Sequence, residues 1–203
     1  MPKPTFFNLP ENKRKKLIEA AETEFSRVAL SQASISNIVK AAGVPRGSFY
    51  QYFENKEDAF YYLLDVQAKE RKEHFIASLK ENDGDLFIAV TELFKMMLDD
   101  ISQEKVHFLK NALIHVTHEV EDIFIKIFED KQTSKDQLRQ ITDLINKENL
   151  NIKDEREFFH IMQIIVSVTF RNLVDKYHRS LSDEEAMENL GIEMKLLKNG
   201  LCK

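Results

Sequence analysis

The chain has 203 residues, of which 43% are hydrophobic and 31% charged, a balance typical of folded globular proteins and too apolar for a disordered one. Its net charge of −5 excludes a protein that is basic throughout, and its single cysteine excludes a framework of internal disulfides and fits a reducing cytoplasm. No apolar run approaches the roughly 20 residues that span a bilayer. We therefore expect a cytoplasmic protein without a membrane segment.

Charge is divided unevenly along the chain. Residues 1–56 carry nine Lys or Arg and five Glu, a net charge of +4, whereas the remainder carries 20 basic and 29 acidic residues, a net charge of −9. A basic module on an acidic body indicates that only the first part meets a polyanion. Chance clustering of surface lysines would give the same pattern, so charge alone leaves both interpretations open.

The N-terminal quarter predicts three helices. Apolar residues recur at helical spacing over residues 10–28. A short second helix follows at 34–42, with Ser34 placed to cap it and Gly43 placed to end it. A third brief helix spans residues 46–53. Helices this short cannot bury their own faces, so the first helix must complete a three-helix core with them. The expected core residues are Ile38, Val39, Phe49 and Phe53.

The rest of the chain also shows helical spacing and no lasting strand alternation, which predicts an all-α fold of about nine helices. Asn55 is placed to cap a fourth helix, which Asn82-Asp83-Gly84 ends near residue 80. Further helices are expected at 85–101, as two or three helices from 104 to 150 with breaks near 119–121 and 133–134, at 154–177, and at 183–198 with Ser182 or Asp183 as cap.

The segment from Ser34 to Glu57 reads SISNIVKAAGVPRGSFYQYFENKE. It resembles the N-terminal signature of the TetR family of transcriptional regulators, in which Ala-Gly-Val is followed by Gly-x-Phe-Tyr-x-Tyr-Phe-x-x-Lys-Glu at this spacing. The resemblance covers residues from about 10 to 65. The chain departs from the family pattern at Ala33, Val39 and Pro45, where the family usually has threonine, alanine and serine.

The resemblance implies a helix-turn-helix DNA-binding domain at 1–54 and a larger helical ligand-sensing and dimerisation domain at 55–203. It also implies that the third helix lies in the major groove of DNA. Arg46 at its start can grip guanine or contact a phosphate, and Gln51 can pair with adenine or face solvent. The expected DNA-binding residues are Ser34, Arg46, Gly47, Ser48, Tyr50, Gln51, Tyr52 and Lys56.

Several of these residues have a second interpretation. The hydroxyls of Tyr50 and Tyr52 can donate to phosphates, or their rings can serve only the core. Lys56 joins a positive charge to the free N–H groups of a helix terminus, which suits a phosphate, but it can also be a solvated lysine. Gly47 would let the backbone approach DNA closely, or it is merely a tolerated helix residue.

One recognition helix covers few bases, and a two-fold dimer solves this by presenting two helices to a palindromic site. The resemblance implies that the last two helices form a four-helix bundle with their copies. The candidate residues, which the sequence does not divide between core and interface, are Phe158, Ile161, Ile165, Val168, Leu173, Met187, Leu190 and Leu197.

In the family, a ligand bound between the central helices changes the spacing of the recognition helices, which requires different ligand affinities for the two states. With 15 Phe, 6 Met and no Trp, the interior suits a hydrophobic or aromatic ligand. For each candidate taken singly, the sequence favours an ordinary core residue over a pocket residue. The candidate pocket residues are Phe94, Met97, Phe108, Phe124, Phe159, Met162 and Phe170.

Catalysis finds no support in the sequence, since no Ser-His-Asp arrangement, phosphate loop or carboxylate pair stands out. His107, His115 and His118 could bind a metal or haem, but no Cys joins them and the acidic residues nearby indicate a surface position. We expect no enzyme and no cofactor, but a homodimeric repressor of a palindromic double-stranded DNA operator that a small-molecule effector releases. The alternatives are an activator, a regulator that responds to a protein, or a helical enzyme or scaffold that has lost DNA binding.

Overall fold

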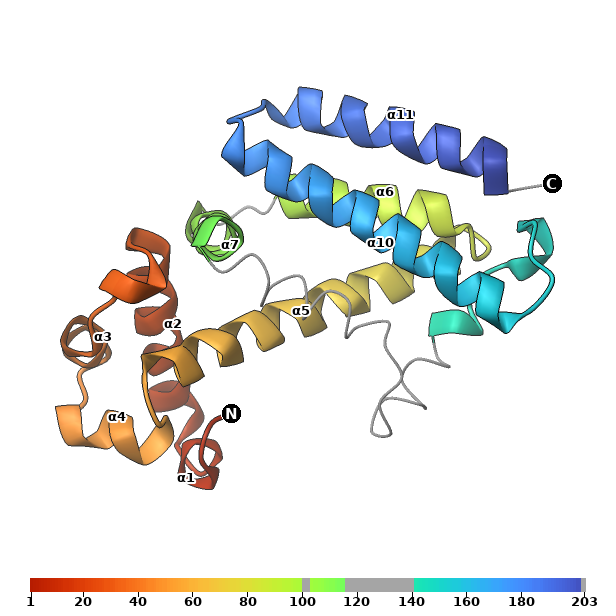
Figure 1. Cartoon of the computed structure of the whole chain (residues 1–203). Coiled ribbons are helices and arrows are strands. Elements are labelled where there is room, and N and C mark those ends of the chain that lie inside the picture. Colours follow the sequence, from red (N-terminus) through yellow and green to blue (C-terminus); the bar gives the residue numbers. More distant parts are fainter. Residues whose placement is uncertain (100–102, 116–140, 202–203) are drawn as a thin grey trace. The chain divides into compact units, whose positions relative to one another are not determined.

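The computed structural model describes residues 1–99, 103–115 and 141–201 (Figure 1). Over these residues the chain is all-α, which confirms the predicted fold class. Two short 3₁₀ helices lie at Leu30–Gln32 (η1) and Lys147–Asn149 (η2). The α-helices are α1 Pro4–Phe7, α2 Glu11–Arg27, α3 Ile35–Ala42, α4 Arg46–Tyr52, α5 Lys56–Glu81, α6 Leu86–Asp99, α7 Gln103–His115, α10 Glu155–His178 and α11 Asp183–Leu201.

Helix α1 is the one described α-helix that the sequence pattern did not predict, because four residues are too few to show a period. The predicted breaks near 119–121 and 133–134, and any helices around them, lie outside the described residues. Within the described part, no helix has the length and apolar character needed to cross a membrane.

The chain divides into two compact units. The first comprises residues 1–67 and 100–117, and the second comprises residues 68–99 and 118–203. The first unit thus includes the start of α5 and, through α7, a segment from later in the chain. The domain boundary expected between residues 54 and 55 stays a prediction.

Aromatic side chains fill the core of the first unit. Phe25 on α2 meets Phe60 on α5 edge-to-face, with ring centroids 5.2 Å apart, and Phe60 meets Phe108 on α7 at 5.1 Å. Such pairs add stability beyond the area that they bury. All of the core residues predicted for the three-helix module are buried, at 6% exposure or less, namely Ile38, Val39, Phe49 and Phe53.

Gly43 and Asn55 act at the helix ends as predicted, but Ser34, placed to cap α3, makes no side-chain cap hydrogen bond. Gly43 ends α3 with φ +68°, a left-handed conformation that glycine adopts at little cost, and the N–H of Val44 then donates to the carbonyl of Val39 at 3.0 Å. Asn55 caps α5, since its Oδ1 accepts from the backbone N–H of Asp58 at 2.8 Å. These two ends place α4 between α3 and α5.

In the second unit, α11 packs on α10 and on α6 (Figure 1). A tight turn precedes α6, with φ +51° at Asp83 and +77° at Gly84. The carbonyl of Gly84 accepts from the N–H of Asn146 at 2.9 Å, which ties the turn to the segment before η2. Ser182 is the residue that caps α11, because its hydroxyl accepts from the N–H of Glu185 at 3.1 Å.

Candidate nucleic-acid interface

One face of helix α4 packs against the core, and the opposite face is exposed. Phe49 is fully buried and lies against the ring of Phe53, with centroids 5.4 Å apart. The side chains of Arg46 and Gln51 are exposed, and Tyr50 is 44% exposed. A helix anchored in this way can present several side chains to a groove without losing its core contacts.

The structure positions Arg46 through a neighbouring helix. Its Nη1 donates to the Oγ of Ser36 on α3 at 2.9 Å. A guanidinium carries five N–H donors, so this single bond leaves others for a base edge or a phosphate. Gly47 follows directly, and a Cβ built there would meet nothing within 4 Å. The first turn of α4 is therefore open on its outer side.

The side chain of Lys56 contacts the segment just before Ser34. The ammonium of Lys56 donates to the carbonyl of Ser31 at 2.7 Å and to that of Ala33 at 3.2 Å. It thus joins the first turn of α5 to the loop before α3. An ammonium has three donors, so one remains available. Lys56 is accordingly a structural bridge and not merely a solvated lysine.

Glu24 is a further residue of this region, which the sequence analysis did not select. Its side chain is 5% exposed, and its carboxylate accepts from the backbone N–H of Ser34 at 2.8 Å, from Asn37 Nδ2 at 3.1 Å, and from the guanidinium of Arg27. Ser34 makes no side-chain cap of its own, so Glu24 supplies the acceptor at the start of α3. The sequence does contain a sign that Glu24 is buried, because it lies on the apolar stripe of α2, seven residues after the buried Leu17.

Opposing effects set the pKa of Glu24. Burial raises it, but the hydrogen bonds from Ser34, Arg27 and Asn37 outweigh burial and hold the pKa below the ordinary value of 4.5. Glu24 therefore stays ionised at neutral pH and fixes α3 to α2.

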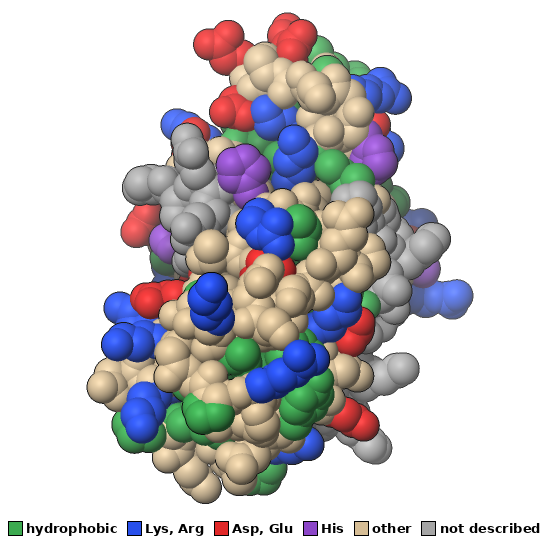
Figure 2. Space-filling view, turned by 90° about the vertical axis from the view of Figure 1, so that its left-hand side faces the viewer, with side chains coloured by type: hydrophobic (Ala, Val, Ile, Leu, Met, Phe, Trp, Pro, Cys, Tyr) green, Lys and Arg blue, Asp and Glu red, His purple; other side chains and the backbone are tan. Residues whose placement is uncertain are grey.

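The face of the first unit that carries α3 and α4 bears Lys and Arg side chains spread across it (Figure 2). Among the exposed basic residues of this unit are Lys13, Lys15, Lys16, Lys40 and Arg46. The spread of positive charge on this face suits a phosphate backbone, which supplies most of the sequence-independent affinity for DNA.

The candidate pocket residues divide between the units. In the second unit Phe94, Met97, Met162 and Phe170 are buried, and Phe159 is partly buried. Phe108 lies in the core of the first unit, beside Phe25 and Phe60. Phe124 lies outside the described residues. Four of the candidates are therefore buried side chains of the second unit.

Most of the interface candidates lie inside their own unit. Phe158, Ile161, Ile165, Leu173 and Leu190 are buried, and Val168, Met187 and Leu197 are partly exposed. Among the described side chains of α10 and α11, the large apolar residues that are exposed are three that were not selected from the sequence. They are Ile164, Ile192 and Leu196, which are 44%, 53% and 66% exposed.

Metal-binding side chains do not gather in the described part of the chain, where no three His, Cys, Asp or Glu residues are placed to hold an ion. His118, one of the three histidines noted in the sequence, lies outside the described residues.

Two family models match the chain. "Bacterial regulatory proteins, tetR family" matches residues 17–61, and "Tetracyclin repressor-like, C-terminal domain" matches residues 85–201. An uncharacterized HTH-type transcriptional regulator of Bacillus subtilis (strain 168), YdgC, is 31% identical over 154 residues, which are 72% of this chain and 68% of that protein.

Solved structures share the fold over nearly the whole chain. One is SmeT, the repressor of the Stenotrophomonas maltophilia multidrug efflux pump SmeDEF, with 16% identity, a TM-score of 0.63, and coverage of 95% of this chain and 93% of that one. Another is the fatty acid degradation regulator FadR from Bacillus halodurans, with 20% identity, a TM-score of 0.62, and coverage of 95% and 97%. At these identities the likeness shows the fold alone.

Proposed function

The chain belongs to the TetR family of bacterial transcriptional regulators, and from this premise we propose that it is a homodimeric repressor of a palindromic operator, released by a small hydrophobic effector. Membership makes it a helix-turn-helix regulator and not an enzyme, since the matched proteins are regulators. The interpretation as an enzyme or scaffold that has lost DNA binding is therefore not retained.

The observation that carries the proposal is the open outer face of α4. Phe49 anchors the helix in the core, while Arg46, Tyr50 and Gln51 remain exposed on one short helix. Helix-turn-helix proteins place the N-terminal residues of the second helix against base edges in the major groove. Arg46 stands at that end, and its bond to Ser36 holds the guanidinium in place before DNA arrives.

Arg46 and Lys56 are assigned different tasks, which binding measurements distinguish. We expect Arg46→Ala to relax selectivity at one base pair in each half-site, at a cost of about 1–3 kcal/mol for the preferred base. Lys56→Ala should weaken binding to all sequences and lower the slope of log affinity against log salt by roughly one. Lys80→Ala, at an exposed position late in α5, is the matched control. Unchanged binding by both test variants would refute the assignment.

Dimerisation is supported by the apolar residues left exposed on α10 and α11. Ile192 and Leu196 are four residues apart on α11 and so share a face, and Ile164 is exposed on α10. An exposed apolar patch marks an interaction surface, and a second copy meeting it by two-fold symmetry would present two α4 helices to one palindrome.

The test of this interface is the mass in solution. Ile192→Glu combined with Leu196→Glu should convert a dimer into a monomer in sedimentation equilibrium, because two carboxylates would be buried at the contact. Ile88→Glu is the matched control, since Ile88 on α6 is 40% exposed and also apolar. A dimer that survives the double substitution would place the interface elsewhere.

An apolar effector is supported by the large Phe and Met side chains of the second unit. Phe94, Met97, Met162 and Phe170 are at most 5% exposed, so a ligand reaching them would lose its water. Hydrophobic compounds that raise the Tm of the protein should also release it from DNA. A ligand that binds the DNA-free conformation more tightly stabilises the protein and also weakens its binding to DNA. Compounds that stabilise the protein but leave operator affinity unchanged would contradict release by an effector.

A further inference from the structure

The C-terminal end of α4 has an unusual source of hydrogen bonds. The last four carbonyls of an α-helix lack a donor within the helix. In α4, the carbonyl of Phe49 accepts from the N–H of Phe53 at 2.9 Å, just past the helix. The carbonyls of Tyr50, Gln51 and Tyr52 remain, and each of them accepts from a residue near the N-terminus of the chain.

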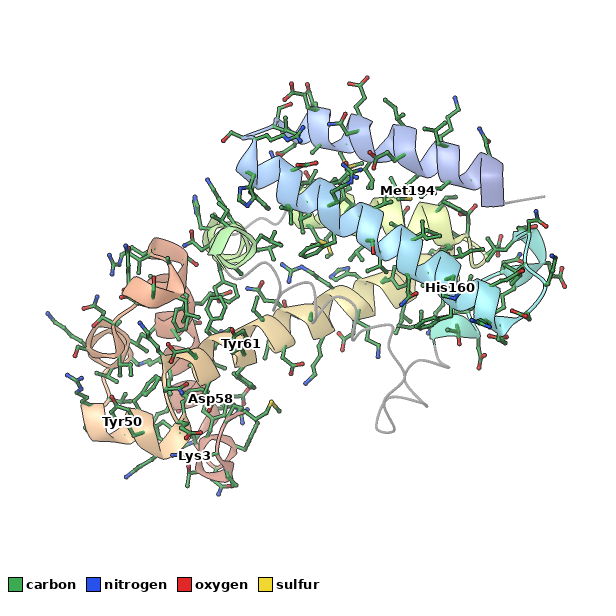
Figure 3. The ribbon with its side chains drawn as sticks, in the orientation of Figure 1. Lys3, Tyr50, Asp58, Tyr61, His160 and Met194 are labelled. Atoms are coloured by element: carbon green, nitrogen blue, oxygen red, sulfur yellow. The ribbon has the colours of Figure 1, made fainter. Side chains whose placement is uncertain are left out.

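Two residues provide these donors. The backbone N–H of Lys3 donates to the carbonyl of Tyr52 at 2.8 Å, and its ammonium donates to the carbonyl of Tyr50 at 2.8 Å. The hydroxyl of Thr5 donates to the carbonyl of Gln51. Figure 3 shows Lys3 next to the helix that carries Tyr50. A positive charge at this end also complements the helix dipole.

Phe6 fixes these donors to the core. Its side chain is fully buried, and its ring centroid lies 5.0 Å from that of Phe53 and 5.2 Å from that of Tyr62 on α5. Phe53 directly follows α4, so the ring that anchors residues 3–7 packs against the residue where the helix stops. Residues 3–7 are therefore anchored to the core, which keeps their donor groups at the C-terminal end of α4.

We propose that Lys3 and Thr5 are positioning residues for operator recognition, which keep the last turn of α4 helical without touching DNA themselves. The proposal rests on the proposed function, since the order of α4 matters to affinity only if α4 reads DNA. Helix α4 has seven residues, too few to be stable alone, so the loss of an end contact shifts it toward frayed states. DNA then binds only the ordered fraction.

Thr5 gives the sharpest test because it is exposed and has two closely matched replacements. Thr5→Val keeps the shape and loses the hydroxyl, whereas Thr5→Ser keeps the hydroxyl. We expect Thr5→Val to lower affinity for the DNA selected from a random pool by up to about tenfold, because affinity follows the ordered fraction of α4 and one hydrogen bond sets the limit of that loss. Thr5→Ser should bind like the wild type, and so should Thr5→Val on unrelated DNA.

Lys3→Met distinguishes positioning from a phosphate contact. If Lys3 acts through α4, its loss lowers affinity for the selected DNA and leaves the salt slope and binding to unrelated DNA unchanged. A phosphate contact would instead lower affinity for both DNAs and reduce the salt slope by about one, and that result would overturn the role proposed for Lys3.

Hydrogen exchange without DNA separates this inference from the proposed function. In Thr5→Val, the amides of residues 50–53 should exchange faster than in the wild type and in Thr5→Ser, while those of α2 stay unchanged. Equal exchange in all three proteins would overturn the inference, whatever the DNA result. If Thr5→Val exchanges faster but the wild type selects no DNA, the result would support the contact between Thr5 and α4 and refute the proposed function.

Discussion

Glu24 allows a quantitative prediction about the helix-turn-helix unit. Glu24→Gln keeps the size of the side chain but leaves one oxygen where the carboxylate had two. Oε1 accepts from Ser34 and Asn37, and Oε2 accepts from the Nε of Arg27 at 3.0 Å. The substitution preserves the first set of bonds and turns an amide N–H₂ toward a guanidinium, so that donor faces donor.

The size of the effect follows from how much of this ion pair is buried. Breaking a fully buried pair costs about 3–5 kcal/mol, and an exposed pair contributes about 0–1 kcal/mol. Glu24 is 5% exposed and Arg27 is 55% exposed, which places this pair between the two cases. We expect Glu24→Gln to lower the free energy of unfolding of the first unit by about 2 kcal/mol at pH 7.

The assay is urea unfolding followed by far-UV circular dichroism, with hydrogen exchange in α3 to assign the loss to the first unit. Glu19→Gln on the same helix is the control, because Glu19 is 57% exposed and its pair with Lys15 is long, at 3.9 Å. That control should stay within about 0.5 kcal/mol of the wild type. Equal stability of the two variants would refute the role given to Glu24.

The same carboxylate predicts a pH dependence. Since the pKa of Glu24 is lowered by folding, its contribution is complete above the ordinary value of 4.5 and is lost as pH falls through the lower folded pKa. The difference in stability between wild type and Glu24→Gln should therefore shrink below about pH 4.5. A difference that is constant from pH 7 to pH 3 would show that the charge is not the cause.

Two other sites give predictions in the same assay. Gly84→Ala should destabilise the second unit by more than about 2 kcal/mol, because a Cβ at φ +77° would lie 2.4 Å from the carbonyl oxygen of Leu144. Gly43→Ala is the comparison: its φ is +68° and a Cβ there would meet nothing within 4 Å, so it should cost only about 1 kcal/mol. Equal losses in the two variants would contradict the clash. Burial raises the pKa of Asp85, but its bond to Lys198 at 2.8 Å and the N–H groups of Ile88 and Phe87 lower it below the ordinary 3.8. Asp85→Asn should therefore cost about 0.5–1 kcal/mol at pH 7, and the cost should fade below about pH 3.8; a loss that persists there would refute the charge argument.

Local signals in the sequence were sufficient to predict the helices of the helix-turn-helix module, but not the cap of α3, where Ser34 makes no side-chain bond. The stop at Gly43, the cap at Asn55 and the burial of Phe49 each depend on one residue and its near neighbours. Such features can be predicted because a left-handed glycine or an amide cap acts within a few residues. Helix α1 was not predicted because its four residues are stabilised by contacts with α4 and α5, about fifty residues away in the sequence.

Burial within the last helices was harder to predict. Ile164 and Ile165 are adjacent and chemically alike, yet one is 44% exposed and the other fully buried. The apolar stripe on α10 is wide enough for both, and which residue faces inward depends on where α6 and α11 pack against it. Glu24 shows the reverse case, in which a charged residue is buried because the N–H of Ser34, ten residues later, needs an acceptor.

Selection of DNA from a random pool at two salt concentrations tests the central claim most directly. A dimer with one open α4 face per subunit should enrich a palindrome whose half-sites are about one helical turn, or a multiple of it, apart. The protein should bind that palindrome less tightly at the higher salt concentration. An enriched site without two-fold symmetry, or no enrichment at either salt concentration, would contradict a dimeric repressor that reads DNA through α4.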